Sequence, residues 1–283
     1  MRVALIGWPL GHSVSPAMQN AAFSACGIQG TYEAVPTPPD DFEGTVARLR
    51  AEGYAGANVT IPHKVAALRL ADDASPQTRA AGAANTLLFR GGRVEARNTD
   101  VSGFLASWKA SLGLDRLRDA SVLVLGAGGA ARAVLVALTH ARVKRVSLLA
   151  RKPEQAHRVL QEISGPRWPN YETRVHFLTN EDFARTLQSA SAVINTTPLG
   201  MSPNPDDAPV TWPKEIPAGL AACDVVYNPR PTRFLREAAA RGADTLDGLG
   251  MLVEQGAAAF EAWTGATAPR EVMWTAAEAA LQK

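Results

Sequence analysis

The chain has 283 residues, of which 46% are hydrophobic, enough for two ordinary domains that each bury a core. Its 29 Lys and Arg against 27 Asp and Glu leave a net charge of +2, which does not favour a nucleic-acid binder. The two cysteines, Cys26 and Cys223, lack metal-ligand spacing and indicate a reducing compartment.

No membrane association is expected. The apolar run at the N-terminus is too short for a signal peptide. The longest apolar region, 121–138, is interrupted by glycines and by Arg132, which argues against a membrane span. We therefore expect a soluble cytoplasmic protein, as a monomer or a homodimer, with a small-molecule substrate and no metal, membrane or nucleic-acid partner.

The first hundred residues alternate β-prone runs with helical patterns. The elements expected in chain order are strand 2–7, helix 15–27, strand 32–37, helix 40–53, strand 56–60 and helix 62–72. Residues 85–100 predict a hairpin that turns at Gly91-Gly92. Residues 101–114 predict a helix with an apolar face that includes Phe104 and Trp108.

A second unit is expected to start near Ser121. Apolar strands are predicted at 121–126, 145–151, 175–179, 191–197 and 222–228, separated by helical or loop segments. This alternation predicts a parallel, doubly wound sheet. Residues 198–217 hold six prolines and predict a long loop, and the chain from Gly248 onward predicts helix.

A glycine motif lies inside the apolar region 121–138. Gly126, Gly128 and Ala131 form the pattern G-x-G-x-x-A between a predicted strand and a predicted helix. The glycines allow a tight turn and close approach of a pyrophosphate, and the helix N-terminus supplies N–H donors. The motif predicts dinucleotide binding; the alternative is a structural strand–turn–helix.

The next predicted strand ends in Ala150, Arg151 and Lys152. A carboxylate at this point is typical of an NAD site, whereas cations suit the 2′-phosphate of NADP. The residues therefore favour NADP. The alternative is that both cations are solvated loop charges, and Glu154 is close enough to leave NAD open.

Several polar residues follow strands in the first half, where ligands of α/β sheets bind. They are Ser13, Ser15, Thr60, Lys64, Asn85 and Asp100. Four of them have a structural alternative: Ser15 and Asp100 as helix caps, Asn85 as a turn residue, and Lys64 as a surface lysine. We interpret His12 and His63 as structural or peripheral.

Lys64 is unusual because it falls in the first turn of a predicted helix, where the helix dipole disfavours an ammonium group. Hydride transfer to or from an alcohol carbon requires a proton to move on the oxygen. A lysine near a helix N-terminus can exchange that proton, and a nearby carboxylate can fix its position. Lys64 and Asp100 are the candidates for these two roles.

The motifs together resemble those of the shikimate dehydrogenase family. The matching stretches, in chain order, are IGWPLGHSVSP, GANVTIPHK, GAANTL, NTDVSGF, LGAGGAARA, NTTPLGM, DVVYNP and DGLGMLVEQGA. The resemblance implies a substrate-binding α/β domain of residues 1–103 completed by helices 248–283, and a Rossmann-type NADP domain of residues 104–247. It also implies an active site in the cleft between them.

The resemblance further implies reversible NADPH-dependent reduction of 3-dehydroshikimate to shikimate, with Lys64 and Asp100 as the catalytic dyad. By the same resemblance, the substrate-binding residues are Ser13, Ser15, Thr60, Asn85, Tyr227 and Gln255. The implied cofactor-binding residues are Gly126, Ala127, Gly128, Gly129, Ala130, Arg151, Lys152, Thr196, Gly248 and Met251.

Three positions depart from the family pattern. Ala150 and Lys152 replace the residues that commonly flank the arginine, and Trp8 stands where a smaller or polar residue is common. A quinate/shikimate dehydrogenase with relaxed substrate or NAD preference therefore remains an alternative, although the Ser13/Ser15 pair favours shikimate. A non-catalytic NADP-binding regulator is the alternative from another class. A folate or tRNA-linked dehydrogenase lacks support from the motifs around Ser13 and Gln255.

Overall fold

The computed structural model describes residues 1–11, 13–163 and 172–282. The chain divides into two compact units. Unit 1 comprises residues 1–103 and 253–283, and unit 2 comprises residues 104–252. The chain leaves unit 1 after Gly103 and returns to it at Val253. Gly248 belongs to unit 2, where its N–H donates to the Val226 carbonyl.

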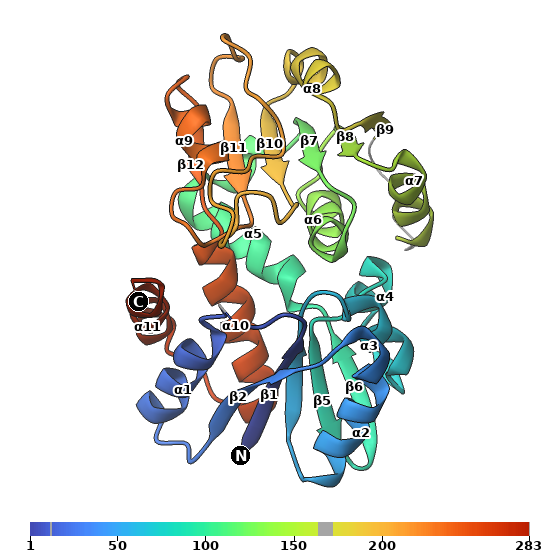
Figure 1. Cartoon of the computed structure of the whole chain (residues 1–283), viewed down its shortest axis with the longest axis vertical. Helices are drawn as coiled ribbons and strands as arrows, with labels where there is room; N and C mark the ends of the chain where they lie inside the picture. The colour runs from blue at the N-terminus through green and yellow to red at the C-terminus, as the bar shows by residue number, and fades with distance from the viewer. Residues whose placement is uncertain (12, 164–171, 283) are drawn as a thin grey trace. The chain divides into compact units, whose positions relative to one another are not determined.

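Unit 1 is built on a six-stranded sheet in the order β2-β1-β3-β5-β6-β4 (Figure 1). Its strands are β1 (Arg2–Gly7), β2 (Thr31–Pro36), β3 (Gly56–Val59), β4 (Asp73–Ala74), β5 (Thr86–Arg90) and β6 (Arg93–Arg97). Its helices are α1 (Ser15–Ala25), η1 (Pro39–Asp41), α2 (Phe42–Ala51), α3 (Lys64–Leu70), α4 (Pro76–Ala81) and α11 (Arg270–Leu281). Helices α5 (Thr99–Ser111) and α10 (Leu249–Thr264) contain the unit boundaries.

Alternating residues of the unit 1 strands supply two apolar faces. On one face, Ala4 and Ile6 of β1 join Phe42, Val46 and Leu49 of α2 in one buried cluster. The opposite face packs on α1 and α10, where the rings of Phe23 and Phe260 have centroids 5.4 Å apart. The sheet of unit 1 is therefore covered on both sides, as its buried strands require.

The ends of five unit 1 segments meet at one edge of the sheet. Strands β1 and β3 are parallel, with Ile6 opposite Val59. Strand β5 is antiparallel to both β3 and β6, with Asn58 opposite Thr86 and Thr86 opposite Arg97. The residues after β1, β3 and β6, and those before β5, consequently lie at the same edge, which also holds the start of α3.

Unit 2 has a fully parallel six-stranded sheet in the order β12-β11-β10-β7-β8-β9. Its strands are β7 (Ser121–Leu125), β8 (Arg145–Ala150), β9 (Glu172–Phe177), β10 (Ala192–Asn195), β11 (Ala221–Asp224) and β12 (Asp244–Leu246). Its helices are η2 (Leu114–Arg116), α6 (Gly129–His140), α7 (Pro153–Glu162), α8 (Asn180–Leu187) and α9 (Arg233–Ala239). This is the doubly wound order of dinucleotide-binding domains, with its switch point between β7 and β10.

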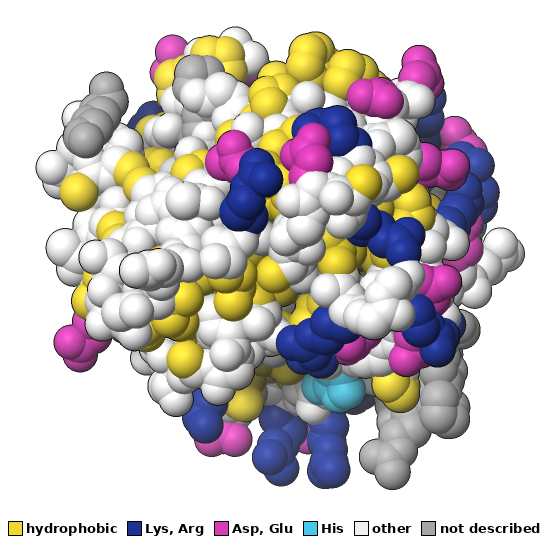
Figure 2. Space-filling model, turned by 90° about the horizontal axis from the view of Figure 1, so that it is seen from below, with side chains coloured by type: hydrophobic (Ala, Val, Ile, Leu, Met, Phe, Trp, Pro, Cys, Tyr) yellow, Lys and Arg dark blue, Asp and Glu magenta, His cyan; other side chains and the backbone are white. Residues whose placement is uncertain are grey.

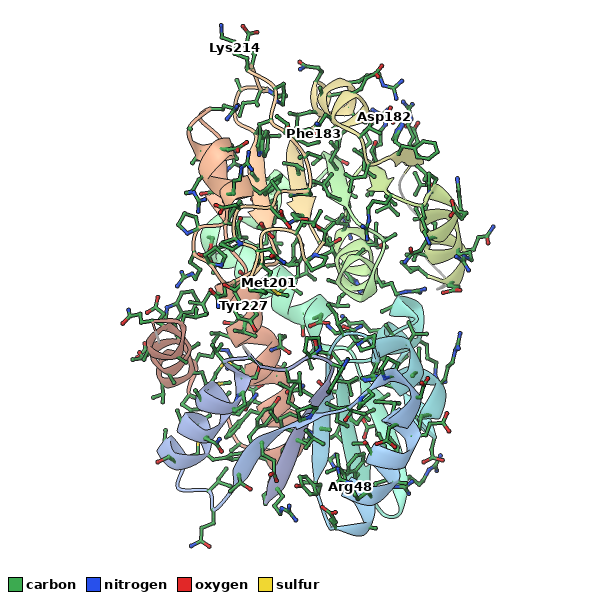
Figure 3. All side chains as sticks on the ribbon, viewed as in Figure 1. Arg48, Asp182, Phe183, Met201, Lys214 and Tyr227 are labelled. Atoms are coloured by element: carbon green, nitrogen blue, oxygen red, sulfur yellow. The ribbon has the colours of Figure 1, made fainter. Side chains whose placement is uncertain are left out.

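The core of unit 2 depends on one aromatic group. Phe183 of α8 and Phe234 of α9 both contact Trp212, with ring centroids 5.3 and 5.0 Å away. Figure 3 shows Phe183 directed into the unit and Lys214 at the tip of the loop that carries Trp212. The proline-rich segment 198–217 is a loop, as predicted, yet it contributes the buried Trp212 and Val210 to the core.

The prediction was wrong at several element ends. The strand expected over 222–228 ends at Asp224, because the side chain of Asp224 accepts a hydrogen bond from the Val226 N–H and turns the chain. The short elements β4, α4 and β12 were not predicted, since two, six and three residues are too few to show a periodic pattern. The hairpin of β5 and β6 turns at Gly91-Gly92 as predicted.

The face of the molecule in Figure 2 intersperses acidic and basic side chains rather than concentrating one sign. Exposed ion pairs such as Arg2–Glu33 and Arg48–Glu52 each contribute little to stability. Within the described ranges, no helix is long and apolar enough to span a bilayer. The described residues also contain no group of three or more His, Cys, Asp or Glu placed to hold a metal ion.

The hairpin turn requires glycine, because Gly91 and Gly92 have φ values of 55° and 76°. We expect Gly92→Val to lower the free energy of unfolding by about 1–3 kcal/mol, because a β-branched residue is strained at positive φ. Gly92→Asn should cost less than about 1 kcal/mol, since Asn tolerates this region. Urea unfolding of both variants measures the difference, and equal losses would contradict the assigned turn.

Candidate active site

The centre of the candidate site is an ion pair between Lys64 and Asp100. Lys64 is the first residue of α3, and its Nζ lies 2.6 Å from Oδ2 of Asp100. The Lys64 side chain is 15% exposed and that of Asp100 is 7% exposed. The ammonium is thus held in one position, in a side chain that is largely but not fully buried.

Asp100 is not the helix cap that one interpretation of the sequence proposed. Helix α5 begins at Thr99, and Oδ1 of Asn98 accepts hydrogen bonds from the N–H groups of Asp100 and Val101. Asn98 therefore caps the helix, and its own amide donates to the Ala83 carbonyl. The Asp100 side chain is left available for Lys64, and its charge in the first turn of α5 suits the helix dipole.

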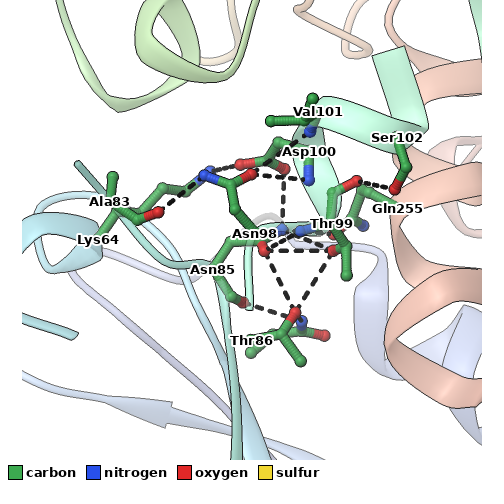
Figure 4. Close-up of polar contacts among 11 residues, drawn as sticks. Lys64, Ala83, Asn85, Thr86, Asn98, Thr99, Asp100, Val101, Ser102 and Gln255 are labelled. Carbon is green, nitrogen blue, oxygen red and sulfur yellow. Dashed lines mark hydrogen bonds and ion pairs between the residues drawn. The ribbon is translucent and has the colours of Figure 1, made fainter. Parts of the chain in front are cut away.

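Asn85 connects the ion pair to the rest of unit 1 (Figure 4). Its Nδ2 lies 2.9 Å from Asp100 Oδ1, 2.9 Å from Thr99 Oγ1 and 3.2 Å from Gln255 Oε1. Its Oδ1 accepts from the Thr99 N–H. Asn85 is therefore more than a turn residue: it binds the second oxygen of Asp100. Nδ2 has two N–H groups for these three acceptors. Its contact with Gln255 is the longest, and a hydroxyl of a ligand can therefore replace it most easily.

Ser13 and Ser15 follow β1, and Thr60 follows β3, at the same edge of the sheet as Asn85. Ser15 is not the cap of α1, since the helix starts at Ser15 and the N-cap position is Val14. The Ser15 N–H donates to Ser13 Oγ instead, and this bond fixes the spacing of the two serines. Lys64, likewise, is not an exposed surface lysine.

His63 is structural, as predicted. It is 2% exposed, its ring stacks on Phe42 at 4.8 Å, and its Nε2 is 2.8 Å from the Thr37 carbonyl. These contacts hold the residue that precedes Lys64. The companion prediction for His12 lies outside the described residues.

In unit 2 the glycine motif forms the expected turn between β7 and α6. Gly126 has a φ of 102°, and a Cβ there would lie 2.9 Å from Thr196 Oγ1. Gly128 is the N-cap of α6, and a Cβ there would meet no described atom within 4 Å. Ala131 is fully buried in the packed helix. The turn thus offers an open surface in front of the α6 N-terminus, with Ala127, Gly129 and Ala130 beside it.

The cations after β8 lie where the sequence predicted them. Arg151 and Lys152 are exposed, and Lys152 is the N-cap of α7. Glu154 is in the first turn of that helix, where a carboxylate suits the helix dipole. Its position therefore has a structural reason, and the exposed groups that directly follow the strand are both basic.

The loops after β10 and β11 are joined by a buried carboxylate that the sequence did not single out. Asp224 is 0% exposed and accepts hydrogen bonds from Asn195 Nδ2, Thr232 Oγ1 and the Val226 N–H. Asn195 in turn accepts from Thr197. This network positions the segment with Thr196, whose hydroxyl donates to the Leu125 carbonyl, and the segment with Tyr227.

The remaining candidates of unit 2 follow β11 and β12 in the chain. Tyr227 is partly exposed in the loop after β11. Gly248 approaches this loop so closely that a Cβ would lie 2.2 Å from the Val225 carbonyl oxygen, which explains the glycine. Met251 is partly exposed in the first turn of α10. Tyr227, Gly248 and Met251 all belong to unit 2.

Fold and sites together define a class: a two-unit α/β protein in which a dinucleotide-binding type of sheet accompanies a unit with a lysine–carboxylate pair. A family model described as shikimate dehydrogenase substrate binding domain matches residues 5–87. A second, described as shikimate 5′-dehydrogenase C-terminal domain, matches residues 248–278. The chain belongs to the shikimate dehydrogenase family.

Similar proteins match this chain over nearly its full length. The chain is 42% identical over 280 residues to shikimate dehydrogenase (NADP(+)) of Symbiobacterium thermophilum, covering 99% of this chain and 94% of that protein. The solved shikimate 5-dehydrogenase of Thermus thermophilus, in complex with NADP(H) and shikimate, is 38% identical with a TM-score of 0.84, covering 99% and 100%. A ligand-free 5-ketofructose reductase of Gluconobacter is 30% identical with a TM-score of 0.82, covering 99% and 98%.

Asp224 makes stability depend on pH. Burial raises its pKa to about 6, against the hydrogen bonds that lower it, from a usual value of 3.8. The folded state then binds more protons than the unfolded state between about pH 4 and pH 6, so stability falls as pH rises through that window. We expect this fall to be of the order of 2–3 kcal/mol.

Asp224→Asn should remove this fall in stability, because an amide does not titrate between pH 4 and pH 7. The variant should keep the local structure, since its amide oxygen retains the contacts with Asn195 and Val226 and its N–H can donate to Thr232. Denaturant unfolding of wild type and variant from pH 4 to pH 7 measures it. Parallel pH profiles would contradict the assignment.

Proposed function

We propose that this chain catalyses the reversible NADPH-dependent reduction of 3-dehydroshikimate to shikimate. The observation that carries the proposal is the 2.6 Å contact of Lys64 with Asp100 in a mostly buried site. Membership of the family and the likeness to a solved relative with NADP(H) and shikimate support the choice of substrate and cofactor.

Lys64 handles the proton on the reacting oxygen. In the reducing direction its ammonium donates a proton to the oxygen that becomes the hydroxyl, and in the reverse direction the amine accepts it. Asp100 holds Nζ in place and balances its charge. Asn85 fixes the carboxylate in turn, so the group that exchanges the proton is positioned before substrate binds.

The other polar groups at the sheet edge suit a small polyhydroxylated acid. The hydroxyls of Ser13 and Ser15 donate to its carboxylate, and Thr60, Asn85 and Gln255 bind its hydroxyls. Asn85 binds a ligand hydroxyl by exchanging its 3.2 Å contact with Gln255. Tyr227 is assigned to substrate binding as well.

The chain's own residues fit NADP, which supplies or accepts the hydride when bound. The open surface at Gly128 and the N–H groups of the first turn of α6 suit a pyrophosphate. Arg151 and Lys152 suit the 2′-phosphate. Thr196, in the loop that the Asp224 network positions, completes the assignment together with Gly248 and Met251 at the start of α10.

An activity matrix of two cofactors and several substrates tests the proposal against its rivals. Shikimate, quinate and a ketofructose should be assayed with NADP and with NAD. The ketofructose arm is motivated by the structural likeness to 5-ketofructose reductase. Shikimate with NADP should give the highest kcat/KM. A preference for quinate or NAD would favour the relaxed enzyme, and cofactor binding without turnover would favour a regulator.

Lys64→Ala should lower kcat by about 10²–10⁴-fold and leave the KM for shikimate within about ten-fold, because the variant loses proton transfer and little binding. Steady-state kinetics at saturating NADP measures both constants. Lys109→Ala is a matched control on the exposed surface of α5 and should behave as wild type. Near-normal turnover of the Lys64 variant would refute the assigned role.

Arg151→Ala should raise the KM for NADP by about ten-fold or more while leaving the KM for NAD nearly unchanged, because one charge-assisted contact with the 2′-phosphate is lost. Arg185→Ala removes another exposed arginine, on α8, and serves as the control. If the Arg151 variant weakens NADP and NAD equally, the cation does not read the 2′-phosphate.

A further inference from the structure

A line of buried polar side chains crosses the sheet of unit 1 from β2 to the ion pair. Tyr32 Oη donates to Asn58 Oδ1 at 2.8 Å, and Asn58 Nδ2 donates to Thr86 Oγ1 at 3.1 Å. Thr86 Oγ1 donates to Asn85 Oδ1 at 3.2 Å, and Asn85 Nδ2 donates to Asp100 Oδ1 at 2.9 Å. Every member is at most 6% exposed.

All four hydrogen bonds point the same way. Each group donates toward Asp100, and the carboxylate is the final acceptor. The Tyr32 hydroxyl is the outermost donor, and it binds Oδ1, the side of Asn58 that faces β2. The Asn58 amide then presents its N–H groups to Thr86 and to the Asn85 carbonyl, which lies 3.0 Å away.

Without the Tyr32 hydroxyl, Oδ1 of Asn58 loses a donor in a buried place. The amide cannot turn to relieve this loss, because its oxygen would then face the Asn85 carbonyl, which lies 3.0 Å from Nδ2. Asn58 would shift instead, and its contacts with the Asn85 carbonyl and with Thr86, which support the residue that fixes Asp100, would be less constrained. Hydrogen bonds in a buried chain strengthen one another, so the loss of one end is felt along it.

Both the backbone and the ring of Tyr32 are held by neighbouring residues. Asn20 of α1 accepts from its backbone N–H at 2.8 Å and donates to its carbonyl at 2.9 Å. Its ring packs on Trp263 with centroids 6.1 Å apart, and Trp263 Nε1 donates to the Leu87 carbonyl of β5. The hydroxyl is therefore held at a defined place relative to the strand that leads from Asn85.

We propose that Tyr32 is a positioning residue for the Lys64–Asp100 pair, acting through Asn58, Thr86 and Asn85. The inference rests on the proposed function for its kinetic consequence, but the geometry it concerns is present in the free chain. Tyr32 acts through these side chains rather than on Lys64 directly; it supplies the donor that holds Asn58 in place against Asn85 and Thr86.

Tyr32→Phe removes the hydroxyl and keeps the ring. We expect kcat for shikimate to fall about ten-fold, because the pair is less well oriented, and the KM for NADP to stay within about two-fold. In an Asp100→Asn background the same change should cost less than about two-fold, because the acceptor that Tyr32 helps to orient is already altered.

Tyr54→Phe is the matched control. Tyr54 is also a buried tyrosine of unit 1, but its hydroxyl donates to Glu33 and accepts from Arg2. The kcat of Tyr54→Phe should equal that of the wild type. Both variants should lower stability in urea by similar amounts, and only Tyr32→Phe should lower kcat. That result would show that the Tyr32 hydroxyl positions the ion pair, since a general loss of stability would lower kcat in both variants.

A second readout needs no turnover. Reductive methylation with ¹³C-formaldehyde gives each lysine a resonance, and Lys64→Arg identifies that of Lys64. The resonance should move in Tyr32→Phe and stay in Tyr54→Phe. An unmoved resonance with wild-type kcat, or equal kcat losses in the presence and absence of Asp100, overturns the proposal. A wild type that does not turn over shikimate refutes the proposed function instead, and the resonance then decides this inference alone.

Discussion

The 2.6 Å contact between an ammonium and a carboxylate, both largely removed from water, is the constraint on which unit 1 depends. Removing such charges from water costs several kcal/mol for each ion, and their attraction offsets the cost only if the remaining polar atoms are also satisfied. The second oxygen of Asp100 is bound by Asn85, and its backbone N–H by Asn98. The pair is therefore inseparable from the asparagines around it.

The mixed sheet explains why these residues can meet. Parallel β1 and β3 deliver Ser13, Ser15 and Thr60 to one edge, and the antiparallel hairpin returns Asn85 and Asn98 to the same edge. Helix α3 starts there with Lys64, and α5 starts there with Asp100 in its first turn. The position of Lys64 at a helix N-terminus, unfavourable by itself, is compensated by a carboxylate from another helix.

In unit 2 a buried carboxylate and its hydrogen bonds hold loops in place. Its parallel sheet leaves helix N-termini and loop amides at one edge, which suits an anionic ligand. The loops after β10 and β11 must still be held in place, and a buried Asp224 does this by accepting three hydrogen bonds. The cost of burying that carboxylate is visible in its raised pKa of about 6.

The sequence alone was sufficient for the features that local physics decides. Apolar periodicity predicted most strands and helices, and glycines marked the turn at Gly91-Gly92 and the motif at Gly126. Polar residues after strands marked the candidate edge, with Lys64 and Asp100 among them. Propensity failed where side chains act over a distance: it offered Ser15 and Asp100 as caps, whereas Val14 and Asn98 occupy those positions.

Only the tertiary structure decided the partners. Lys64 and Asp100 are 36 residues apart, and Asn85 and Gln255 are 170 apart, so no local pattern could pair them. Asn58, Thr86 and Tyr32 read in sequence as ordinary strand residues, and their hydroxyls and amides acquire a direction only when the register places them side by side. A hydrogen bond depends on distances and angles between atoms, and those are fixed by packing rather than by residue type.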